Sequence, residues 1–381
     1  MSDRIPVVVV LGGPSAEHDV SLVSGSAVAA ALAAAGHPVE RVLIDLDGDW
    51  WSLPGSTSGP ASGPAGAGQA LAPADFDRPA ELGAEGPLSS GTVLERLRAR
   101  SPRPVVFIAL HGPFGEDGTI QALLEAADLP YTGSGVAASA LGMDKALFKR
   151  MVRGLGLPVV DWREVSRSRW IGDPAGVLAE LEAFAAGIGD PRLIVKPARL
   201  GSSVGMTLAH DATERPAALD AAFEHDSRAL VERFVADRRE LEVAILGNDG
   251  DPLEEYGPGE ILSGHEFYDY AAKYTPGLSE TSPSAEIDPR LRATILKIAR
   301  DAYRAIGAEG FARLDFLVDG DRPYLSEINT IPGFTPISLF PAMAAAGGYD
   351  FAALAERIVE LGQARWQGRA RRRLVPGDLP R

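Results

Sequence analysis

The chain has no cysteine among its 381 residues. This absence excludes disulfide bonds, thiol nucleophiles, thiolate zinc sites and iron–sulfur clusters, and with them a secreted disulfide scaffold. No segment approaches the ~18 apolar residues of a membrane span. The longest early apolar run, Val7 to Leu11, is too short for the core of a signal peptide. We therefore expect a soluble, cytoplasmic protein with no membrane partner.

Positive charge is also scarce. The 37 Lys and Arg face 52 Asp and Glu, which gives a formal net charge of −15. An extended nucleic-acid surface needs clustered Lys and Arg, so nucleic acid is not expected as a partner. This balance still permits a local basic pocket for a small polyanion. At roughly 150 residues per domain, the length predicts two or three domains.

The first third of the chain predicts a βαβ unit. A β-branched run, Val7–Leu11, ends in Gly12 and Gly13, and a helix then leads to Gly36 and the strand Val42–Ile44. The helix is expected to bury one face: Val20, Val23, Ala27, Ala31 and Leu32. Residues 54 to about 91 are dominated by Gly, Ala, Pro and Ser and predict an irregular insertion. The strand Val105–Leu110 and the loop His111–Gly118 follow.

The second part predicts a separate α+β region. One helix is expected from residue 136 to about Leu155, and Leu193–Lys196 with Thr207–Leu208 predicts a hairpin around a Gly/Ser turn. A long polar segment, 264–284, is expected to be functional because such loops are uncommon in compact domains. The other predicted elements are strands 229–234 and 240–246, helix 289–306, hairpin strands 311–318 and 324–329, and a frayed basic tail from Arg365.

The last predicted hairpin carries the strongest candidate site. Strand side chains alternate, so Arg313 and Asp315 share one face, and Glu327 with Asn329 shares a face of the partner strand. Hard oxygen ligands of this kind suit Mg²⁺, which is often held by one or two carboxylates together with phosphate oxygens. A solvated strand face with an ion pair explains the same residues equally well.

A second candidate is Lys196 followed by the turn Gly201–Gly205. Glycines let backbone N–H groups approach phosphate oxygens, Ser202 and Ser203 add hydroxyl donors, and the lysine supplies a point charge. A plain flexible turn is the alternative. The turn also matches Gly-x-Ser-x-Gly with Ser203 as nucleophile, but that motif needs a following helix where a strand is expected here. The sequence contains neither a P-loop nor a dinucleotide fingerprint.

The remaining polar candidates are Glu17, His111, Lys145, Lys273 and Tyr274. Glu17 stands before a predicted helix, where capping is favoured over a contact with a substrate amine. His111 opens a loop at the carboxyl end of a strand, where ligands bind in open α/β sheets. Lys145 on its helix, and Lys273 with Tyr274 on the long loop, are by default solvated.

Taken together, these segments resemble the D-alanine–D-alanine ligases of the ATP-grasp superfamily. The resemblance runs from about Val7 to Leu361 and depends on several motifs in register. They are residues 12–17, 111–118, 131–135, 143–145, 196–197, 201–205, 268–274, 313–315 and 327–333. It implies an α/β and α+β chain with a three-domain ATP-grasp fold that begins with a Rossmann-like domain.

The resemblance also implies domain bounds. Residues 1–140 would form the Rossmann-like domain with the insertion at about 54–91, and residues 141–240 the central ATP-grasp subdomain. Residues 241–364 would form the C-terminal subdomain with a lid at 264–284, and residues 365–381 the basic tail. A homodimer formed through the N-terminal domain is expected from the same resemblance.

The family's nucleotide and metal residues carry over position by position. Asp315 and Glu327 would hold one Mg²⁺ (or Mn²⁺), and Glu327 with Asn329 a second. The ATP-binding residues would be Lys145, Lys196, Ser202, Ser203, Glu232, Val235, Glu240, Phe267 and Lys273. Within that set Glu232, Val235 and Phe267 would meet the adenine, and Glu240 the ribose.

The substrate residues carry over in the same way. Glu17 would hold the ammonium of the first D-alanine with His111 nearby, Arg313 and the Gly333 N–H would form the oxyanion site, and Ser338 would meet the second carboxylate. Lys273 and Tyr274 would belong to the lid, and Ser203 to the catalytic loop.

The implied reaction is ATP-dependent formation of D-alanyl-D-alanine, through a D-alanyl phosphate, for peptidoglycan precursor synthesis. The run Tyr268–Tyr274 resembles the dipeptide-forming ligases and favours an amine as the second nucleophile. Other acceptors, such as D-lactate or D-serine, stay open, as do a Ser203 hydrolase and a nucleotide-binding relative without activity.

Overall fold

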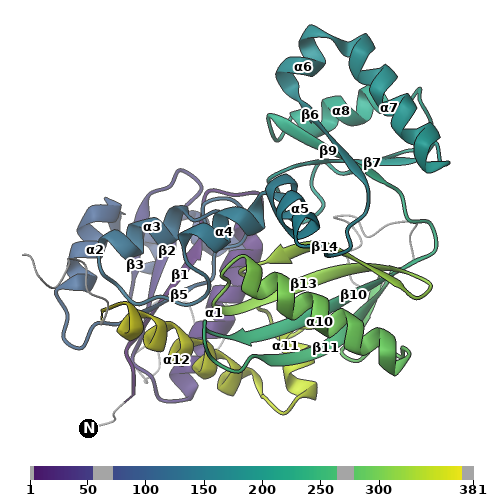
Figure 1. Cartoon of the computed structure of the whole chain (residues 1–381). Helices are drawn as coiled ribbons and strands as arrows, with labels where there is room; N and C mark the ends of the chain where they lie inside the picture. The colour runs from purple at the N-terminus through teal and green to yellow at the C-terminus, as the bar shows by residue number, and fades with distance from the viewer. Residues whose placement is uncertain (1–3, 55–71, 264–278, 371–381) are drawn as a thin grey trace, which may run out of the picture.

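The computed structural model describes residues 4–54, 72–263 and 279–370. These residues form three sheets, of five, four and five strands in chain order. Figure 1 shows the four-stranded sheet in a lobe that stands away from a body containing the other two sheets. We call the former the central lobe, residues 162–233. The predicted site residues therefore come from both the central lobe and the body, and can form one site only where the two meet.

The N-terminal sheet has the strand order β4-β3-β2-β1-β5. Its parallel strands are β1 (Val7–Gly12), β2 (Val39–Ile44) and β5 (Val105–Ile108), and α1 (His18–Ala34) connects the first two. This confirms the predicted βαβ unit. Every residue of β1 is buried, as expected for a central parallel strand. Two more helices, α2 (Ser90–Arg98) and α3 (Thr119–Ala126), belong to this part of the chain.

The expectation of an irregular insertion is wrong for its second part, residues 72–91. Short 3₁₀ helices occupy Pro73–Asp77 and Pro79–Leu82, and Phe76 is buried in the core. Strand β4 (Glu85–Leu88) pairs with β3 (Trp50–Leu53) at the edge of the sheet. The Gly- and Pro-rich composition concealed one aromatic anchor and one edge strand. Residues 55–71 lie outside the described residues.

The packed face of α1 also differs from the prediction. The helix buries Ser21, Leu22, Gly25, Val28 and Leu32, among others, and leaves Val23 44% exposed. Small residues allow the close approach, since a Cβ at Gly25 would lie 2.5 Å from the Cβ of Leu11. A search for large apolar side chains at helical spacing therefore selects the wrong face.

The central lobe is an antiparallel sheet in the order β6-β9-β7-β8. Its strands are β6 (Trp162–Ser166), β7 (Leu193–Pro197), β8 (Thr207–Ala209) and β9 (Arg228–Arg233), and its helices are α6 (Arg167–Gly172), α7 (Pro174–Ile188) and α8 (Arg215–Phe223). The predicted hairpin is confirmed, because Val195 pairs with Thr207. The hairpin presents the Gly/Ser turn at one edge of the lobe.

The third sheet is antiparallel in the order β12-β11-β10-β13-β14. Its strands are β10 (Arg238–Gly247), β11 (Glu254–Ser263), β12 (Ser279–Ser282), β13 (Gly310–Asp319) and β14 (Arg322–Asn329). Burial alternates along β13, with Leu314, Phe316 and Val318 inside. These side chains share a core with Ile295 and Ala299 of α10 (Pro289–Ala305). The opposite face is left for the polar residues, as predicted.

The single helix expected from residue 136 to 155 is two helices, α4 (Val136–Met143) and α5 (Lys145–Gly154). Asp144 interrupts them with an extended backbone (φ −84°, ψ 92°), and its carboxylate accepts a hydrogen bond from the Leu147 N–H. Asp is a strong N-cap residue, so the break starts a new helix at Lys145. Figure 1 shows α5 between the central lobe and the body.

The C-terminal region returns to the start of the chain. Residues of α11 (Leu339–Ala346) and α12 (Phe351–Ala370) share a core with β1, α1 and β5. The frayed tail expected from Arg365 is wrong up to residue 369, because Arg365 is buried with its guanidinium 4.0 Å from the centre of the Tyr131 ring. Residues 371–381 lie outside the described residues. No helix in the described ranges is long and apolar enough to cross a membrane.

Candidate active site

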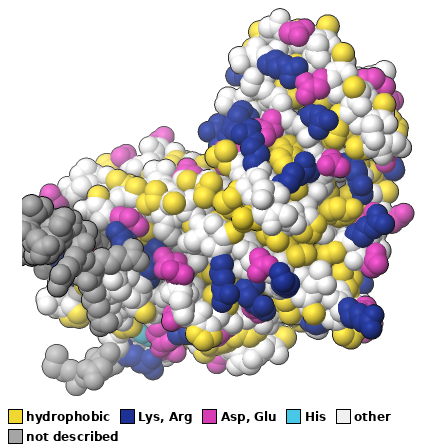
Figure 2. Space-filling view, viewed as in Figure 1, with side chains coloured by type: hydrophobic (Ala, Val, Ile, Leu, Met, Phe, Trp, Pro, Cys, Tyr) yellow, Lys and Arg dark blue, Asp and Glu magenta, His cyan; other side chains and the backbone are white. Residues whose placement is uncertain are grey.

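A cavity of about 940 Å³ opens where the central lobe meets the body. This volume is at the upper end of the range usual for small-molecule sites. Fifteen of the residues singled out from the sequence line it: Glu17, His111, Lys145, Lys196, Ser202, Ser203, Glu232, Val235, Glu240, Arg313, Asp315, Glu327, Asn329, Gly333 and Ser338. Phe267, Lys273 and Tyr274 lie outside the described residues. Figure 2 shows Lys and Arg side chains near this junction on one face, despite the net negative charge.

The floor of the cavity is the polar face of β13 and β14. Arg313 pairs with Asn329 across the two strands, and Asp315 with Glu327. The Arg313 guanidinium donates to both Asp315 oxygens at 2.7 Å, and the Asn329 amide donates to Asp315 Oδ2 at 3.0 Å. Two carboxylates directly opposite each other destabilise a strand pair unless positive charge compensates them. Positive charge is therefore built into this face.

Glu242 is a member of this floor that sequence reasoning missed. Its carboxylate is buried and lies 3.2 Å from Arg313 Nε. Burial alone would lower the pKa of Arg313, but the Asp315 and Glu242 carboxylates raise that pKa well above its ordinary value. The alternation Glu240-x-Glu242 on β10 could have revealed it, because both side chains line the cavity.

Glu17 lies at the N-cap position of α1, but its side chain makes no capping hydrogen bond. The capping interpretation favoured from the sequence is therefore wrong. The carboxylate instead accepts a hydrogen bond from the Ser202 hydroxyl through Oε1. Oε2 is buried without a hydrogen-bond partner among the described residues. Glycines border it, since a Cβ at Gly112 would lie 2.5 Å from Oε2 and one at Gly201 2.7 Å.

His111 and Glu116 form the wall behind Glu17. His111 is buried, with Nδ1 2.9 Å from the Ile331 carbonyl and Nε2 2.9 Å from Ser24 Oγ. Burial lowers the pKa of His111. Burial and the nearby Glu17 raise the pKa of Glu116 to about 8, although its carboxyl accepts from the N–H groups of Gly112 (3.1 Å) and Ile331 (3.3 Å). Glu116, in the predicted loop, was not singled out from the sequence.

Lys145 is buried, which corrects the expectation of a surface lysine. Its Nζ donates to the Leu200 carbonyl at 2.8 Å and lies 3.0 Å from Glu327 Oε2. Burial alone would lower the pKa of Lys145, but Glu327 raises it above its usual value. The lysine therefore connects the loop after β7 to the polar face of β14.

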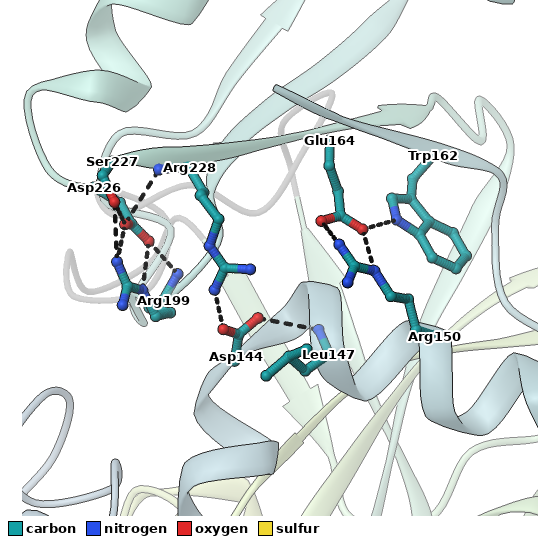
Figure 3. A network of polar contacts seen from close by, with 9 residues as sticks. All are labelled: Asp144, Leu147, Arg150, Trp162, Glu164, Arg199, Asp226, Ser227 and Arg228. Atoms are coloured by element: carbon teal, nitrogen blue, oxygen red, sulfur yellow. Dashed lines mark hydrogen bonds and ion pairs between the residues drawn. The ribbon is translucent and has the colours of Figure 1, made fainter. Parts of the chain in front are cut away.

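A network of ion pairs fixes the helix that carries Lys145 to the central lobe, as Figure 3 shows. Asp144, next to it in sequence, pairs with Arg228 at the start of β9. Six residues further along the chain, Arg150 donates to Glu164 of β6, which also accepts from the Trp162 indole at 3.2 Å. Helix α5 is thus attached to two strands of the lobe, and Lys145 reaches from there toward the body.

Lys196 is the next-to-last residue of β7, and its Nζ lies 2.9 Å from Glu232 Oε2. The other oxygen of Glu232 lies 2.8 Å from Lys149 Nζ. Sequence reasoning missed Lys149, although its i+4 spacing from Lys145 on one helix was a usable signal. Glu232 is therefore held between two lysines at the edge of the cavity.

The Gly/Ser turn brings Ser202 and Ser203 to the cavity with φ of 50° and 58°. Left-handed values are uncommon for residues other than glycine, so the turn holds both serines in a costly geometry. Strand β8 follows the turn. The strand–turn–helix context required for a Ser203 nucleophile elbow is therefore not present here.

The remaining predicted residues also line the cavity. Ser338 Oγ accepts from the Thr335 N–H at 3.1 Å, and a Cβ at Gly333 would lie 3.3 Å from that oxygen. Val235 is buried in the segment that joins β9 to β10, and Glu240 accepts from Arg238 Nε at 3.0 Å. The cavity thus runs from Glu17 to this joining segment.

Lysines and carboxylates converge where two antiparallel sheets meet, and a mixed sheet precedes both of them in the chain. This combination defines an ATP-grasp enzyme. Solved ligases of this type have the same arrangement of the whole chain. The "D-alanine-D-alanine ligase from Coxiella burnetii" is 30% identical, with a TM-score of 0.75 over 97% of both chains. The "VanG D-Ala:D-Ser Ligase from Enterococcus faecalis" is 28% identical, with a TM-score of 0.77 over 94% of this chain and all of its own. The predicted fold class is confirmed.

Sequence comparison identifies the family. The family model described as "D-ala D-ala ligase N-terminus" matches residues 6–134, and the model described as "D-ala D-ala ligase C-terminus" matches residues 151–360. The "D-alanine--D-alanine ligase" of Heliobacterium modesticaldum is 40% identical over 98% of both chains. That of Mycobacterium sp. strain KMS is 40% identical over 96% of this chain and 98% of its own. The chain belongs to the D-alanine–D-alanine ligase family.

Proposed function

We propose that the chain joins two D-alanine molecules at the expense of ATP, with ADP and phosphate as the other products, for peptidoglycan precursor synthesis. Family membership over nearly the full length supports this function. The observation that carries it is the meeting of a buried carboxylate, a partly buried arginine and two lysines in one nucleotide-sized cavity. Each residue role given below is part of the proposal.

The first substrate is recognised at Glu17. Its Oε2 is buried beside the cavity without a hydrogen-bond partner among the described residues, and an ammonium group supplies the donor that it lacks. Leaving such an acceptor unsatisfied costs roughly 1–3 kcal/mol, so binding an amine relieves a real penalty. His111 lies at the same end of the cavity and borders the bound amino acid.

Activation of the carboxylate comes next, because a carboxylate is unreactive toward amines. One oxygen of the first D-alanine attacks the γ-phosphorus of ATP, the bond to the β,γ-bridging oxygen breaks, and ADP leaves an acyl phosphate behind. Lys145 and Lys196 contact the phosphates and offset their charge, and the turn with Ser202 and Ser203 closes over the γ-phosphate. Glu232 and Val235 border the adenine, and Glu240 the ribose.

The second step forms the peptide bond. The uncharged amine of the second D-alanine attacks the acyl carbon and forms a tetrahedral oxyanion, and the amine proton and phosphate then leave. Arg313 and the Gly333 N–H donate to this oxyanion, and Ser338 contacts the second carboxylate. Loss of one such donor typically costs 10²–10³-fold in rate, by the usual magnitude of about 2.7–4 kcal/mol. Phe267 is proposed to pack on the adenine, Lys273 to contact ATP from the lid, and Tyr274 to belong to the same lid.

Divalent metal ions are expected with ATP, and the residues present fit them. Asp315, Glu327 and Asn329 supply hard oxygen donors on one face of two paired strands. The carboxylates of Asp315 and Glu327 face each other, and Arg313 and Lys145 balance their negative charge. A bound cation can balance the same charge. We propose that these three residues hold two Mg²⁺ (or Mn²⁺) ions. Such ions neutralise charge on a transferring phosphoryl group.

The acceptor is the point at which related ligases diverge, because one of the similar structures is that of a D-Ala:D-Ser ligase. Phosphate release from ATP, with Mg²⁺ and either D-alanine alone or D-alanine plus D-serine or D-lactate, discriminates the alternatives. We expect release with D-alanine alone, and a dipeptide identified by mass spectrometry. If phosphate release requires D-serine or D-lactate, the acceptor assignment is wrong. If no amino acid stimulates it, the ligase proposal fails.

The family expectation also covers the oligomeric state and the cellular location of the chain. We propose a homodimer that acts in the cytoplasm, where ATP is available, in line with the family expectation. Light scattering coupled to size-exclusion chromatography gives the mass directly. A mass near twice 40.1 kDa supports the dimer, and a mass near 40.1 kDa contradicts it.

A further inference from the structure

Lys149 is a buried cation that none of the steps above uses. It lies on α5 one turn beyond Lys145, and its side chain is 0% exposed. Its Nζ lies 2.8 Å from Glu232 Oε1 and 5.7 Å from the centre of the Trp162 ring. A lysine is almost never fully buried unless it is paired, so this position needs an explanation.

Glu232 lies between two lysines, and within the described part of the chain no other carboxylate forms an ion pair with either of them. Its Oε1 faces Lys149 and its Oε2 faces Lys196, at 2.8 and 2.9 Å. Burial alone would raise the pKa of Glu232, but the two lysines lower it to about 2. Burial lowers the pKa of Lys149, and the Glu232 carboxylate opposes that shift. With all three groups ionised, the two lysines and the carboxylate carry a net charge of +1. Such a surplus is costly away from water and suits the edge of a site for an anion.

The three residues come from three different elements, so their arrangement is fixed by the fold. Lys149 comes from α5, Lys196 from β7 and Glu232 from β9. Figure 3 shows α5 attached to the same lobe through Asp144–Arg228 and Arg150–Glu164. Lys149 therefore stays against Glu232 without having to reach the cavity itself, whose lining includes Lys196 and Glu232 but not Lys149.

We propose that Lys149 is a positioning residue for ATP, acting through Glu232 on Lys196. By occupying one oxygen of Glu232, it stops that carboxylate from neutralising Lys196 and leaves a full positive charge for the nucleotide phosphates. Without Lys149, Glu232 and Lys196 form a closed neutral pair. The inference rests on the proposed function, because it takes Lys196 to contact the phosphates.

A merely structural role for Lys149 makes a different prediction. If the lysine only neutralises a buried carboxylate, its loss lowers stability and affects all ligands alike. If it keeps Lys196 available, its loss weakens ligands with phosphates much more than ligands without them. ADP and adenosine differ only in the phosphates, so their dissociation constants separate the two roles.

The test compares Lys149→Met with Lys149→Arg by calorimetry with ADP and adenosine, and by steady-state kinetics. In Lys149→Met we expect the Kd for ADP to rise about tenfold or more. The Kd for adenosine and the KM for D-alanine should change less than about twofold, which is within ordinary mutational scatter. Lys149→Arg keeps the charge and should restore ADP binding. Lys149→Gln, which keeps a polar contact with Glu232, replaces the Met variant if that variant does not fold.

Two controls separate charge from packing. Phe148→Leu perturbs the neighbouring, fully buried position on α5 without changing charge. Lys297→Met removes a lysine that is 71% exposed and pairs with Asp301 far from these elements in sequence. Neither should change the ratio of ADP to adenosine affinity. An unchanged Kd for ADP in Lys149→Met, or an equal loss for both ligands, overturns the inference. Failure of the unmodified chain to bind ADP would instead overturn the proposed function.

Discussion

Gly201→Ala is a small change aimed directly at the carboxylate that is proposed to hold the first D-alanine. A Cβ at Gly201 would lie 2.7 Å from Glu17 Oε2 and 3.2 Å from Oε1. Ordinary van der Waals contact begins at 3.4 Å. The backbone of Gly201 is not in the left-handed region, so alanine introduces no backbone strain there. The carboxylate, at the end of a flexible side chain, is the group that must move.

The expected magnitude follows from that displacement. Moving from 2.7 Å to ordinary contact requires a shift of about 0.7 Å for the carboxylate oxygen. A misplacement of about 1 Å costs on the order of 10²-fold in a positioned reaction. We therefore expect kcat/KM for D-alanine to fall by roughly 10- to 100-fold. Because only a side-chain end moves, the free energy of unfolding should change by less than about 1 kcal/mol.

The assay is phosphate release at saturating ATP with varied D-alanine, together with thermal unfolding. Gly187→Ala is the matched control, because this glycine lies in α7 and nothing lies within 4 Å of a Cβ there. Alanine in a helix should stabilise the chain by about 0.5–1 kcal/mol without changing the kinetics. A Gly201→Ala enzyme with kcat/KM for D-alanine within twofold of the original would refute the role given to Glu17.

Three other changes test separate parts of the site. Glu327→Gln should reduce turnover below detection and weaken the dependence on Mg²⁺, and retained activity would contradict the metal assignment. Ser203→Ala should keep measurable ligase activity, because Ser203 is not the nucleophile; complete loss without a binding defect would argue otherwise. The pKa of Glu116 is raised from 4.5 to about 8, so its protonated form stabilises the fold. That stability is full below pH 4.5 and is lost as pH rises toward 8. Glu116→Gln should remove this part of the pH dependence in urea titrations, and an unchanged slope would count against it.

The polar face of β13 and β14 was predictable from the sequence, and the reason is geometric. Alternation along a strand depends only on the strand being extended, so Arg313 and Asp315 must share a face once the strand is assigned. The hairpin around the Gly/Ser turn was predictable for the same reason. The pairing of Asp315 with Glu327 was not predictable, because the register set by the short turn would place Ser326 opposite Asp315. A β-bulge between Asp315 and Phe316 shifts the register by one residue and brings Glu327 there.

Burial and long-range partners were not predictable in the same way. Lys145 and Glu17 were assigned to a surface and to a helix cap, because nothing local reveals that Glu327 and Ser202 lie against them. Gly25 shows the same limit for packing, since a close contact with Leu11 selects the buried face of α1. Asp144 breaks a predicted helix because its capping bond and its pair with Arg228 outweigh helix propensity. In each case a contact distant in sequence decides the outcome.

The central claim is that this cavity activates a D-alanine carboxylate with ATP and transfers it to a second D-alanine. An ¹⁸O-transfer experiment tests it most directly. D-Alanine is labelled with ¹⁸O at both carboxylate oxygens, and the ¹⁸O content of the phosphate released is measured by mass spectrometry. Acyl phosphate formation transfers one carboxylate oxygen to phosphate, so the account predicts one ¹⁸O in each phosphate and a D-alanyl-D-alanine product. Phosphate without ¹⁸O, or phosphate release without dipeptide, would contradict it.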